Sequence, residues 1–452
     1  MTESEESAGF PHLIFKKHIF DPLRGYIGIT EPELSIINNK LFQRTHHLRQ
    51  LGPAHLVYPT ATHTRFSHML GAMHVMTEFC RNIRDYETDK LIFSDKEELQ
   101  KLRIAALLHD IGHYPLSHIL EQALYDIAEE EHLKGDFDHE TFGRHIISQT
   151  SLSDTIKASG YDPAEIVKIL TGEAQVEEDR KILYRFFLDS DLDVDRTDYL
   201  LRDSYFTGVG YGHVAAERLM NTITYSKDYG VVFKKTTEAL ENFFIGRYHM
   251  YQSVYFHKVL YGFEILVKYI YKMLYDENKI VYGPMQIFKL NDSQIQDFDD
   301  NYFYSKLVNY QGNNQYLRDM IRMFRERLPL AMSISSRNLM TASESDVNPL
   351  LKYLLQPHGI QKLRSEISSK SGVDEKWIFP VTVNYKKLLK DNPSKTKIAI
   401  KVVRNNNVIP LDQDTGSIIH ILQKYSSLEA RVYAKKDGSE KVEETIRKMF
   451  GG

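Results

Sequence analysis

The sequence predicts a mainly α fold with a short β-hairpin before one large helical domain and a small α+β appendage after it. Three observations predict this. Apolar residues recur at helical spacing from Glu31 to about residue 345, two short alternating runs flank turn residues near the start, and further alternating runs appear only after about residue 348. The 452 residues exceed one simple core, so we expect more than one structural unit.

The chain begins with a polar, acidic stretch, and we expect residues 1–12 to form a disordered tail. Residues 13–29 predict a hairpin, in which LIFKKHIF and YIGIT are the strands and DPLRG is the turn. Helical spacing starts at Glu31. Beyond it we expect helices at roughly 66–84, 97–110, 116–131, 138–149, 163–170, 179–188, 195–206 and 236–275.

Changes in polarity and apolar periodicity along the sequence divide the chain into further regions. The main domain is expected over 13–290 and a helical extension over 291–345. The α+β region is expected over 346–452. Its predicted strands are Trp377–Tyr385, Ile398–Val403 and Leu428–Tyr433, and its predicted helices are Ser417–Tyr425 and Lys441–Phe450.

Composition excludes several classes of protein. The formal net charge of −4 gives no general attraction to nucleic acid. A single cysteine, Cys80, cannot form an intrachain disulfide, which argues against a disulfide-built secreted scaffold. The first nine residues lack a signal peptide's basic and apolar parts, and no uncharged apolar run is long enough to span a bilayer. We therefore expect a soluble, cytoplasmic protein with neither membrane nor nucleic-acid partners.

The strongest local feature is LLHDIGHYPLSH, residues 107–118. An apolar helix ends at His109-Asp110, and Gly112 and Pro115 then bend or break the chain. An imidazole beside a carboxylate at the end of an apolar helix is suited to one cation. Two ligands make a poor site, so further ligands are expected elsewhere.

Two other motifs supply candidates for those ligands. His68 lies in HTRFSHMLG, and Asp195 lies in the acidic run DLDVDRTDYLLRD. With His109 and Asp110 they make a two-imidazole, two-carboxylate set that leaves room for water. Such a set fits one divalent transition metal, and manganese, iron, zinc, cobalt and nickel all stay open. Each residue alone is more often structural, so their joint occurrence carries the prediction.

Seven motifs in this order resemble the HD-domain phosphohydrolases, and among them the dNTP triphosphohydrolases related to the sterile-alpha-motif and HD-domain protein of animal cells. The motifs are KHIFDPLRGYI, FQRTHHLRQLG, HTRFSHMLG, HDIGHYPLSH, DHE, DVDRTDYLLRD and FIGRYHMYQSVYFHK. The resemblance runs from about Phe15 to Lys258. It implies that residues 13–290 form an all-helical HD domain in which His68, His109, Asp110 and Asp195 hold the metal.

The resemblance also implies the catalytic residues of water attack on phosphorus. His118 is the expected proton donor for the leaving oxygen, supported by Glu121. His113 and His139 are expected beside the triphosphate. The alternative for this pair is that they only orient the metal ligands.

A further set of residues matches the family's substrate pocket. Arginine and lysine side chains would hold the phosphates, where Mg²⁺ is also expected with the nucleotide. Two tyrosines would pack on the deoxyribose, and polar groups would bond its 3′-hydroxyl. Because this pocket addresses sugar and phosphates, broad base specificity is expected. The matching residues are Gln50, Leu51, Arg65, Arg196, Tyr199, Asp203, Arg247, Tyr255 and Lys258.

Members of this group act as oligomers that a second nucleotide activates. A homotetramer or homodimer with an activating nucleotide is therefore expected here. Asn38 replaces an acceptor-only aspartate of the family's guanine reader, and His46 replaces an arginine, so the guanine preference does not carry over. A different effector, or activity without one, stays open. The residues that match this allosteric site are Lys17, Phe20, Asn38, Gln43 and His46.

Two alternatives to a dNTP triphosphohydrolase stay open at this point. The chain could be an HD phosphohydrolase that acts on another nucleotide, such as a mono-, di- or cyclic phosphate. It could also be a nucleotide or single-stranded nucleic-acid binding protein with little catalysis. The full set of metal ligands and the absence of net positive charge argue against the second alternative.

Overall fold

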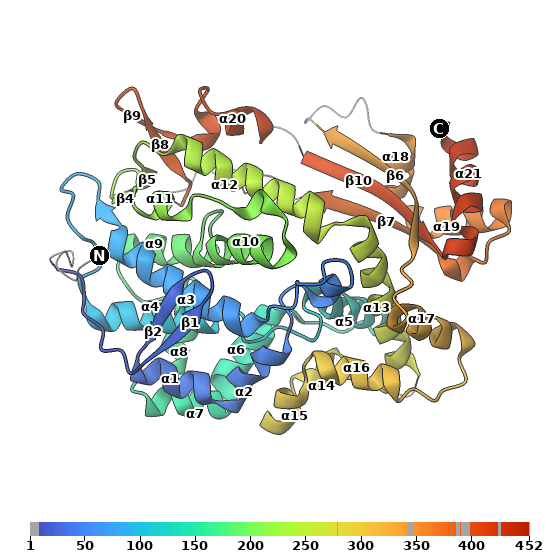
Figure 1. The fold of residues 1–452 in the computed structure, drawn as a ribbon, viewed down its shortest axis with the longest axis horizontal. Coiled ribbons are helices and arrows are strands. Elements are labelled where there is room, and N and C mark those ends of the chain that lie inside the picture. The colour runs from blue at the N-terminus through green and yellow to red at the C-terminus, as the bar shows by residue number, and fades with distance from the viewer. Residues whose placement is uncertain are drawn as a thin grey trace.

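The mainly α prediction is confirmed by a computed structural model, which describes residues 9–277, 279–340, 348–385, 389, 398–423 and 426–451. Helices form the body of the molecule, and two small sheets lie along one side of it (Figure 1). Residues 1–8 of the predicted tail lie outside the described residues.

The predicted N-terminal hairpin is present. Strand β1 (Lys17–Asp21) pairs antiparallel with β2 (Gly25–Ile29), and Asp21 lies opposite Gly25. The Asp21 carboxylate accepts hydrogen bonds from the backbone N–H groups of Leu23 and Arg24, which closes the turn. Helices α1 (Glu31–Asn38) and α2 (Lys40–Gln43) follow.

The helices of the main body begin within a residue or two of the predicted positions, except for the helix over Ser151–Ala158, which was not predicted. Several begin at an aspartate whose carboxylate accepts N–H groups of the first turn, including Asp95, Asp138 and Asp193. The helices are α3 (Arg65–Asn82), α4 (Lys96–Leu108), α5 (His118–Glu130), α6 (His139–Gln149), α7 (Ser151–Ala158), α8 (Pro163–Leu170), α9 (Glu178–Asp189) and α10 (Val194–Thr207).

The single helix predicted over 236–275 is wrong in its middle. Helix α12 (Thr237–Met250) passes into one π-helical turn, Tyr251–Tyr255, and α13 (Lys258–Asp276) begins after it. Apolar periodicity continues through such a turn, so the pattern gives no sign of the change in winding. Isolated π turns within helices often lie at functional sites, and this one ends at Tyr255.

The predicted helical extension over 291–345 is wrong over residues 331–340, and residues 341–345 of it lie outside the described residues. Helices α14 (Pro284–Ile287), α15 (Asp292–Asp297), α16 (Asp300–Val308) and α17 (Gln315–Arg325) are followed by strand β6 (Ala331–Met340). This strand pairs with β10 (Ser426–Ala434), which also pairs with β7 (Ile378–Tyr385), in a three-stranded antiparallel sheet. Helices α18 (Pro349–Leu354), α19 (Gly359–Ser371) and α21 (Ser439–Phe450) pack against that sheet.

The strand predicted at Ile398–Val403 belongs to another sheet. Strand β8 (Lys401–Arg404) pairs with β9 (Asn407–Pro410) and with β5 (Gly230–Phe233). The sheet order is β3-β4-β5-β8-β9, with β3 at Arg84–Asp85 and β4 at Ile223–Ser226. The C-terminal region therefore contributes strands to two places. It is not one appended unit, because strand partners are chosen by packing and not by nearness in sequence.

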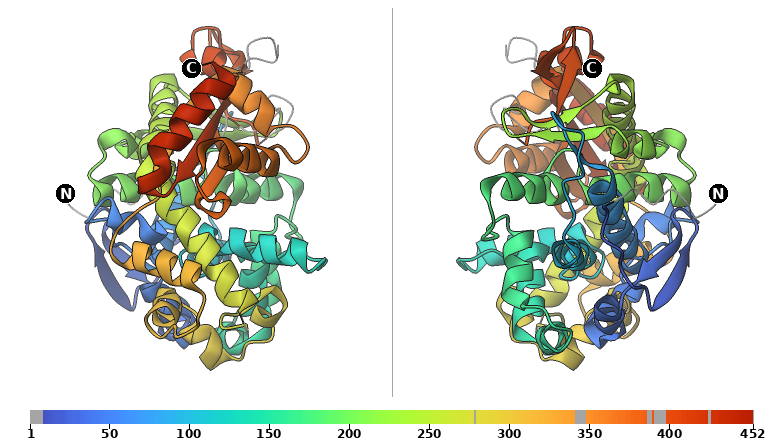
Figure 2. Two further views of the ribbon diagram at one scale, coloured as in Figure 1. Left: turned by 90° about the vertical axis from the view of Figure 1, so that its right-hand side faces the viewer. Right: turned by 90° about the vertical axis from the view of Figure 1, so that its left-hand side faces the viewer.

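Helix α13 links the two sides of the molecule. Both views in Figure 2 place the C-terminal strands and helices on the opposite side from α14–α16, with α13 between them. Helix α13 contacts α5, α17 and β6, so it joins the main body to the C-terminal sheet. In the described part of the chain no helix combines the length and apolar character needed to cross a bilayer.

Candidate metal centre and active site

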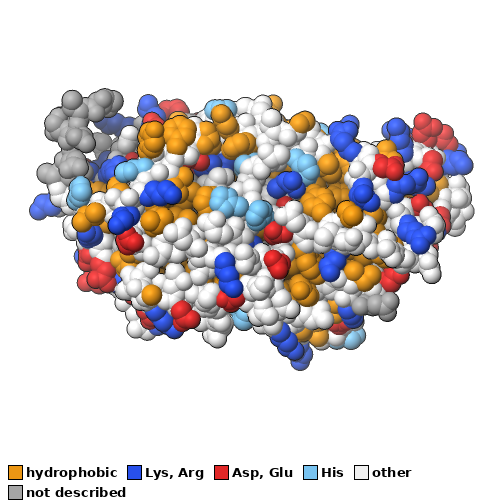
Figure 3. Space-filling model, turned by 60° about the horizontal axis from the view of Figure 1, so that its bottom comes forward, with side chains coloured by type: hydrophobic (Ala, Val, Ile, Leu, Met, Phe, Trp, Pro, Cys, Tyr) orange, Lys and Arg blue, Asp and Glu red, His pale blue; other side chains and the backbone are white. Residues whose placement is uncertain are grey.

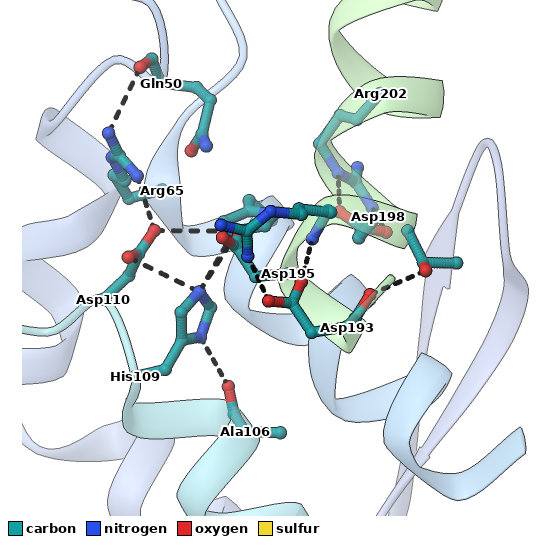
Figure 4. Close-up of polar contacts among 12 residues, drawn as sticks. Gln50, Arg65, Ala106, His109, Asp110, Asp193, Asp195, Asp198 and Arg202 are labelled. Atoms are coloured by element: carbon teal, nitrogen blue, oxygen red, sulfur yellow. Dashed lines mark hydrogen bonds and ion pairs between the residues drawn. The ribbon is translucent and has the colours of Figure 1, made fainter. Parts of the chain in front are cut away.

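The four predicted metal ligands converge from three helix ends. His68 lies in the first turn of α3, His109 and Asp110 follow α4, and Asp195 lies in the first turn of α10. Nε2 of His68 lies 3.0 Å from Oδ1 of Asp195, 3.4 Å from Oδ2 of Asp110 and 3.2 Å from Nε2 of His109. Figure 4 shows the carboxylates of Asp110 and Asp195 directed toward His109.

The far nitrogen of each imidazole is already bonded. Nδ1 of His68 lies 3.0 Å from Oδ2 of Asp198, and Nδ1 of His109 lies 2.8 Å from the carbonyl oxygen of Ala106. Both acceptors require a proton on Nδ1. The lone pair of each ring is therefore on Nε2, the atom that faces the other ligands.

A glycine lets α10 approach α3 closely enough for this arrangement. A Cβ atom on Gly71 would lie 2.1 Å from Oδ1 of Asp198 and 2.4 Å from Nη2 of Arg202. Gly71 follows His68 by three residues in α3, so both face α10. The close contact carries Asp198 to the His68 ring.

These residues fit a divalent transition metal. Two imidazole nitrogens and two carboxylates form a donor set that such ions accept. The carboxylates around His68 already favour a positive charge on its ring. Burial opposes a charge on His68, but hydrogen bonds with Asp195 and Asp198 outweigh it and raise the pKa of His68 to about 10. A bound cation would supply that positive charge in place of the proton.

Arg65 connects the metal ligands to the substrate residues. Its guanidinium pairs with Asp110 and donates to the Ser117 hydroxyl at 3.0 Å and to the Gln50 carbonyl oxygen at 3.4 Å. Figure 4 shows it between Gln50 and Asp110. It is the only predicted phosphate-binding cation whose side chain bonds a metal ligand among the described contacts.

The predicted catalytic residues form a second cluster next to the ligands. Nε2 of His113 lies 3.2 Å from Oδ1 of Asp110, and its ring stacks on His139 with the ring centroids 3.9 Å apart. Nδ1 of His139 lies 2.7 Å from the Glu121 carboxylate, and Nδ1 of His118 lies 3.7 Å from it. One face of the molecule shows histidine side chains gathered near its middle (Figure 3).

The exposure of these histidines differs. The side chain of His118 is 66% exposed, whereas that of His113 is 2% exposed. Burial opposes charge on both His139 and Glu121, but contact with Glu121 outweighs it and raises the pKa of His139. Contacts with His118 and His139 likewise outweigh burial and lower the pKa of Glu121. His118 is therefore the histidine that an incoming molecule can reach, with an ionised carboxylate behind it.

Two of the predicted sugar-binding residues, Tyr199 and Asp203, lie on the same face of α10 as Asp195. Asp195, Tyr199 and Asp203 follow one another at intervals of four residues. The Tyr255 hydroxyl donates to Asp203 at 2.8 Å, and the Tyr199 and Tyr255 rings meet edge to face with centroids 6.1 Å apart. Gln50 and Leu51 precede this region in the chain; Gln50 is buried, and Leu51 packs on the core.

The remaining predicted cations are placed unevenly. Arg247 is buried on α12 and lies 3.5 Å from Asp191, and Arg196 pairs with Asp193 at the start of α10. Lys258 does not lie with the other predicted phosphate-binding residues. Its side chain is exposed and lines another cavity, together with basic residues that include Arg327.

The predicted allosteric residues lie at the surface of the N-terminal segment. Lys17 and Phe20 are exposed on β1, and Asn38 is exposed at the end of α1. The Gln43 side chain donates to the carbonyl oxygen of Ile37 at 2.7 Å, and His46 stacks on Phe66. A nucleotide site at these residues stays a prediction.

Two residues of the site were not predicted from the sequence. Asp198 orients His68, and His63 lies 2.8 Å from Asp203 through its Nε2 atom. Asp198 could have been found, because it follows Asp195 by three residues and shares its helix face. His63 carries no such signal, since its loop position leaves its direction open.

Comparison with known proteins agrees with this geometry. The model of the HD domain matches residues 65–202, and the model of an HD-associated region matches residues 214–451. The protein MJ1154 of Methanocaldococcus jannaschii is 32% identical over 365 residues, which is 79% of this chain and 68% of that protein. The chain belongs to the HD phosphohydrolase family. Its predicted metal ligands all lie within the HD match.

More distant relatives include named enzymes. The deoxynucleoside triphosphate triphosphohydrolase SAMHD1 homolog of Dictyostelium discoideum is 27% identical over 254 residues, and the match spans 56% of this chain and 48% of that protein. A solved protein from Aquifex aeolicus superposes with a TM-score of 0.71 at 26% identity, covering 95% of this chain and 99% of that one. A phosphohydrolase from Bacteroides thetaiotaomicron, at 22% identity and TM-score 0.70, shows the same fold over 93% of this chain and all of its own length.

Proposed function

We propose that the chain hydrolyses deoxynucleoside triphosphates to deoxynucleoside and triphosphate. The observation that carries the proposal is the row Asp195, Tyr199 and Asp203 on one face of α10. One helical turn rises about 5.4 Å, so the row leads stepwise from the metal ligands to the tyrosines. A nucleotide with its α-phosphate at the metal ligands would extend its sugar along this row.

Each group has a distinct part in the proposed reaction. A divalent ion at the ligands would polarise a phosphoryl oxygen and lower the pKa of a bound water. Water forms a new bond to the α-phosphorus while the bond from that phosphorus to the 5′-oxygen breaks. His118, exposed and backed by Glu121, gives a proton to the leaving 5′-oxygen. Arg65 and Arg247 supply positive charge for the phosphates.

The sugar would meet Tyr199, Asp203 and Tyr255. Asp203 is held from both sides, since His63 contacts one carboxylate oxygen and Tyr255 donates to the other. A carboxylate oxygen has further acceptor capacity, which suits a 3′-hydroxyl. The named triphosphohydrolases among the relatives support this substrate class. By the same resemblance, a homotetramer or homodimer with an activating nucleotide remains part of the proposal.

The test is product analysis across all dNTPs and NTPs, singly and in pairs, with Mn²⁺. The expected products are deoxynucleoside and triphosphate in equal amounts. Orthophosphate or pyrophosphate as the released phosphate, or turnover of only a mono-, di- or cyclic phosphate, would reject the proposal. Asp110→Ala and Asp195→Ala should abolish turnover, whereas Asp374→Ala, at a surface carboxylate, should not.

A further inference from the structure

The loop that joins the HD pair to His118 has an unusual backbone. Residues 111–117 connect His109-Asp110, which follow α4, to the start of α5 at His118. Leu116 and Ser117 lie consecutively at φ of 55° and 56°, a region that side chains other than glycine seldom adopt. Such a conformation persists only where the surroundings hold it. The loop carries His113 and delivers His118, so what holds it decides where both histidines lie.

Arg44, which comes before the loop in the chain, holds the loop through hydrogen bonds. Its side chain is fully buried, and its guanidinium donates to three backbone carbonyl oxygens. Nη1 donates to Ile111 at 3.0 Å, Nη2 donates to His113, and Nε donates to Phe298 at 2.8 Å. None of these acceptors is a carboxylate. Among the described contacts the Arg44 guanidinium bonds only to carbonyl oxygens, which fixes backbone positions, while the nearby Asp299 and Asp300 carboxylates favour its charge.

Asp300, which comes after the loop in the chain, also bonds to the backbone of the loop. It is 2% exposed; Oδ1 accepts the backbone N–H of Leu116 at 2.8 Å, and Oδ2 accepts the backbone N–H of Arg49 at 3.1 Å. Leu116 is the first of the two strained residues. Residues 298–300 therefore join Arg44 to the strained end of the loop, and they lie in the HD-associated region.

We propose that Arg44 and Asp300 are positioning residues for the proton donor. Together they hold loop 111–117 in the strained conformation that places His113 on Asp110 and His118 beside Glu121. They touch neither the metal ligands' side chains nor the predicted substrate groups among the described contacts. The inference rests on the proposed function where it takes His118 as the donor to an alkoxide.

Two substrates that differ in their need for a proton donor distinguish a loss of His118 positioning from a general loss of activity. The 5′-oxygen of a deoxynucleoside leaves as an alkoxide and needs a proton, whereas p-nitrophenolate leaves without one. In Arg44→Lys, Asp300→Asn and Asp300→Ala, kcat for a dNTP should fall at least tenfold. The kcat for bis(p-nitrophenyl) phosphate, KM for the dNTP and the metal bound per chain should each change less than about threefold. Arg44→Lys should retain more dNTP activity than Arg44→Met.

Arg103→Lys is the matched control, since Arg103 is equally buried but pairs with the Glu33 carboxylate. Arg103→Lys should change kcat for the dNTP and kcat for bis(p-nitrophenyl) phosphate by the same factor. Equal losses on both substrates in the Arg44 and Asp300 variants, or no loss on the dNTP, would overturn the proposal.

A second measurement does not depend on the substrate. Backbone amide exchange in a peptide covering 109–120 should quicken at least tenfold in Arg44→Lys and Asp300→Ala, while a peptide from α3 should not change. Unchanged protection would overturn the positioning role even if activity fell. If the wild-type chain releases no triphosphate from any dNTP, the proposed function fails, and the exchange result alone then decides for or against positioning.

Discussion

The carboxylate of Asp198 lies 3.0 Å from Nδ1 of His68 and holds the ring so that its Nε2 atom faces the other metal ligands. Asp198 also pairs with Arg202 at 2.7 Å and Arg24 at 3.0 Å, so two buried arginines fix the carboxylate in turn. The predicted metal site therefore depends on a residue outside the predicted set of ligands.

We expect Asp198→Asn to weaken metal binding about 10- to 100-fold, because the neutral amide no longer makes the imidazole more basic. Competition with a chelator measures the affinity, and excess metal should restore most activity. Asp21→Asn is the control, since Asp21 pairs with Arg202 at 2.7 Å but is not in contact with His68 among the described bonds. An equal loss of affinity in both variants would show that the arginine network, and not the contact with His68, controls the metal.

Gly112 permits the loop after the HD pair to lie against α6. A Cβ atom there would come within 2.1 Å of the carbonyl oxygen of His139 and 2.2 Å of the backbone nitrogen of Gly143. Because both obstacles are backbone, Gly112→Ala must displace α6, and we expect a loss of about 1–3 kcal/mol in stability together with most of the activity. Urea unfolding and turnover measure the two effects.

Gly210→Ala provides the comparison for that variant. Its Cβ would meet nothing within 4 Å, and its φ is not in the left-handed region. Stability should change by less than about 0.5 kcal/mol at such a site. A Gly112→Ala variant as stable and active as Gly210→Ala would contradict the close approach of the loop and α6.

The Tyr255 hydroxyl should contribute to substrate binding through Asp203. Tyr255→Phe removes the 2.8 Å hydrogen bond to one carboxylate oxygen of Asp203 and leaves the other oxygen in contact with His63. One such bond contributes about 0.5–1.5 kcal/mol, so KM for a dNTP should rise roughly two- to tenfold, with a smaller change in kcat. Tyr205→Phe, at an exposed ring on the same helix, should leave both constants unchanged. A change confined to kcat would place Tyr255 in the chemical step instead.

The local sequence predicted the helical body well, and the motifs with the family resemblance named four residues that the structure brings together; that these residues hold a metal stays a prediction. The helices of the body carry regular apolar periodicity, and His109-Asp110 ends such a run at a turn that the sequence itself marks. His68 and Asp195 lie in the first turns of their helices, and the structure brings their side chains together. The helices and the turn after His109-Asp110 depend on residues that are close in the chain, whereas the meeting of His68 with Asp195 depends on the fold.

What the sequence could not predict depends on contacts between distant segments. Strand β8 looks like a partner for β7 and β10, yet it pairs with β5, about 170 residues earlier. Arg44 lies in the motif FQRTHHLRQLG and Asp300 lies in none, but the sequence shows the partners of neither residue, because these partners are backbone groups of another loop. The π turn at Tyr251–Tyr255 keeps an apolar pattern that resembles an ordinary helix.

Glu264 should make the stability of the chain depend on pH. It lies on α13, where burial, only partly offset by Arg431, raises the pKa of its carboxyl to about 8 from 4.5. The folded chain thus holds a proton that the unfolded chain has lost between these two values. Stability should therefore be greatest below about pH 4.5 as far as this group is concerned, and it should fall as pH rises toward 8, by at most about 5 kcal/mol.

Glu264→Gln should remove this dependence, because an amide has no proton to lose. Thermal unfolding from pH 5 to 9 should give similar midpoints for both proteins near pH 5 and a higher midpoint for the variant near pH 9. Glu443→Gln, at a partly exposed residue paired with Arg447, should follow the wild-type curve. Parallel curves for Glu264→Gln and the wild type across the whole range would mean that Glu264 ionises freely in the folded chain.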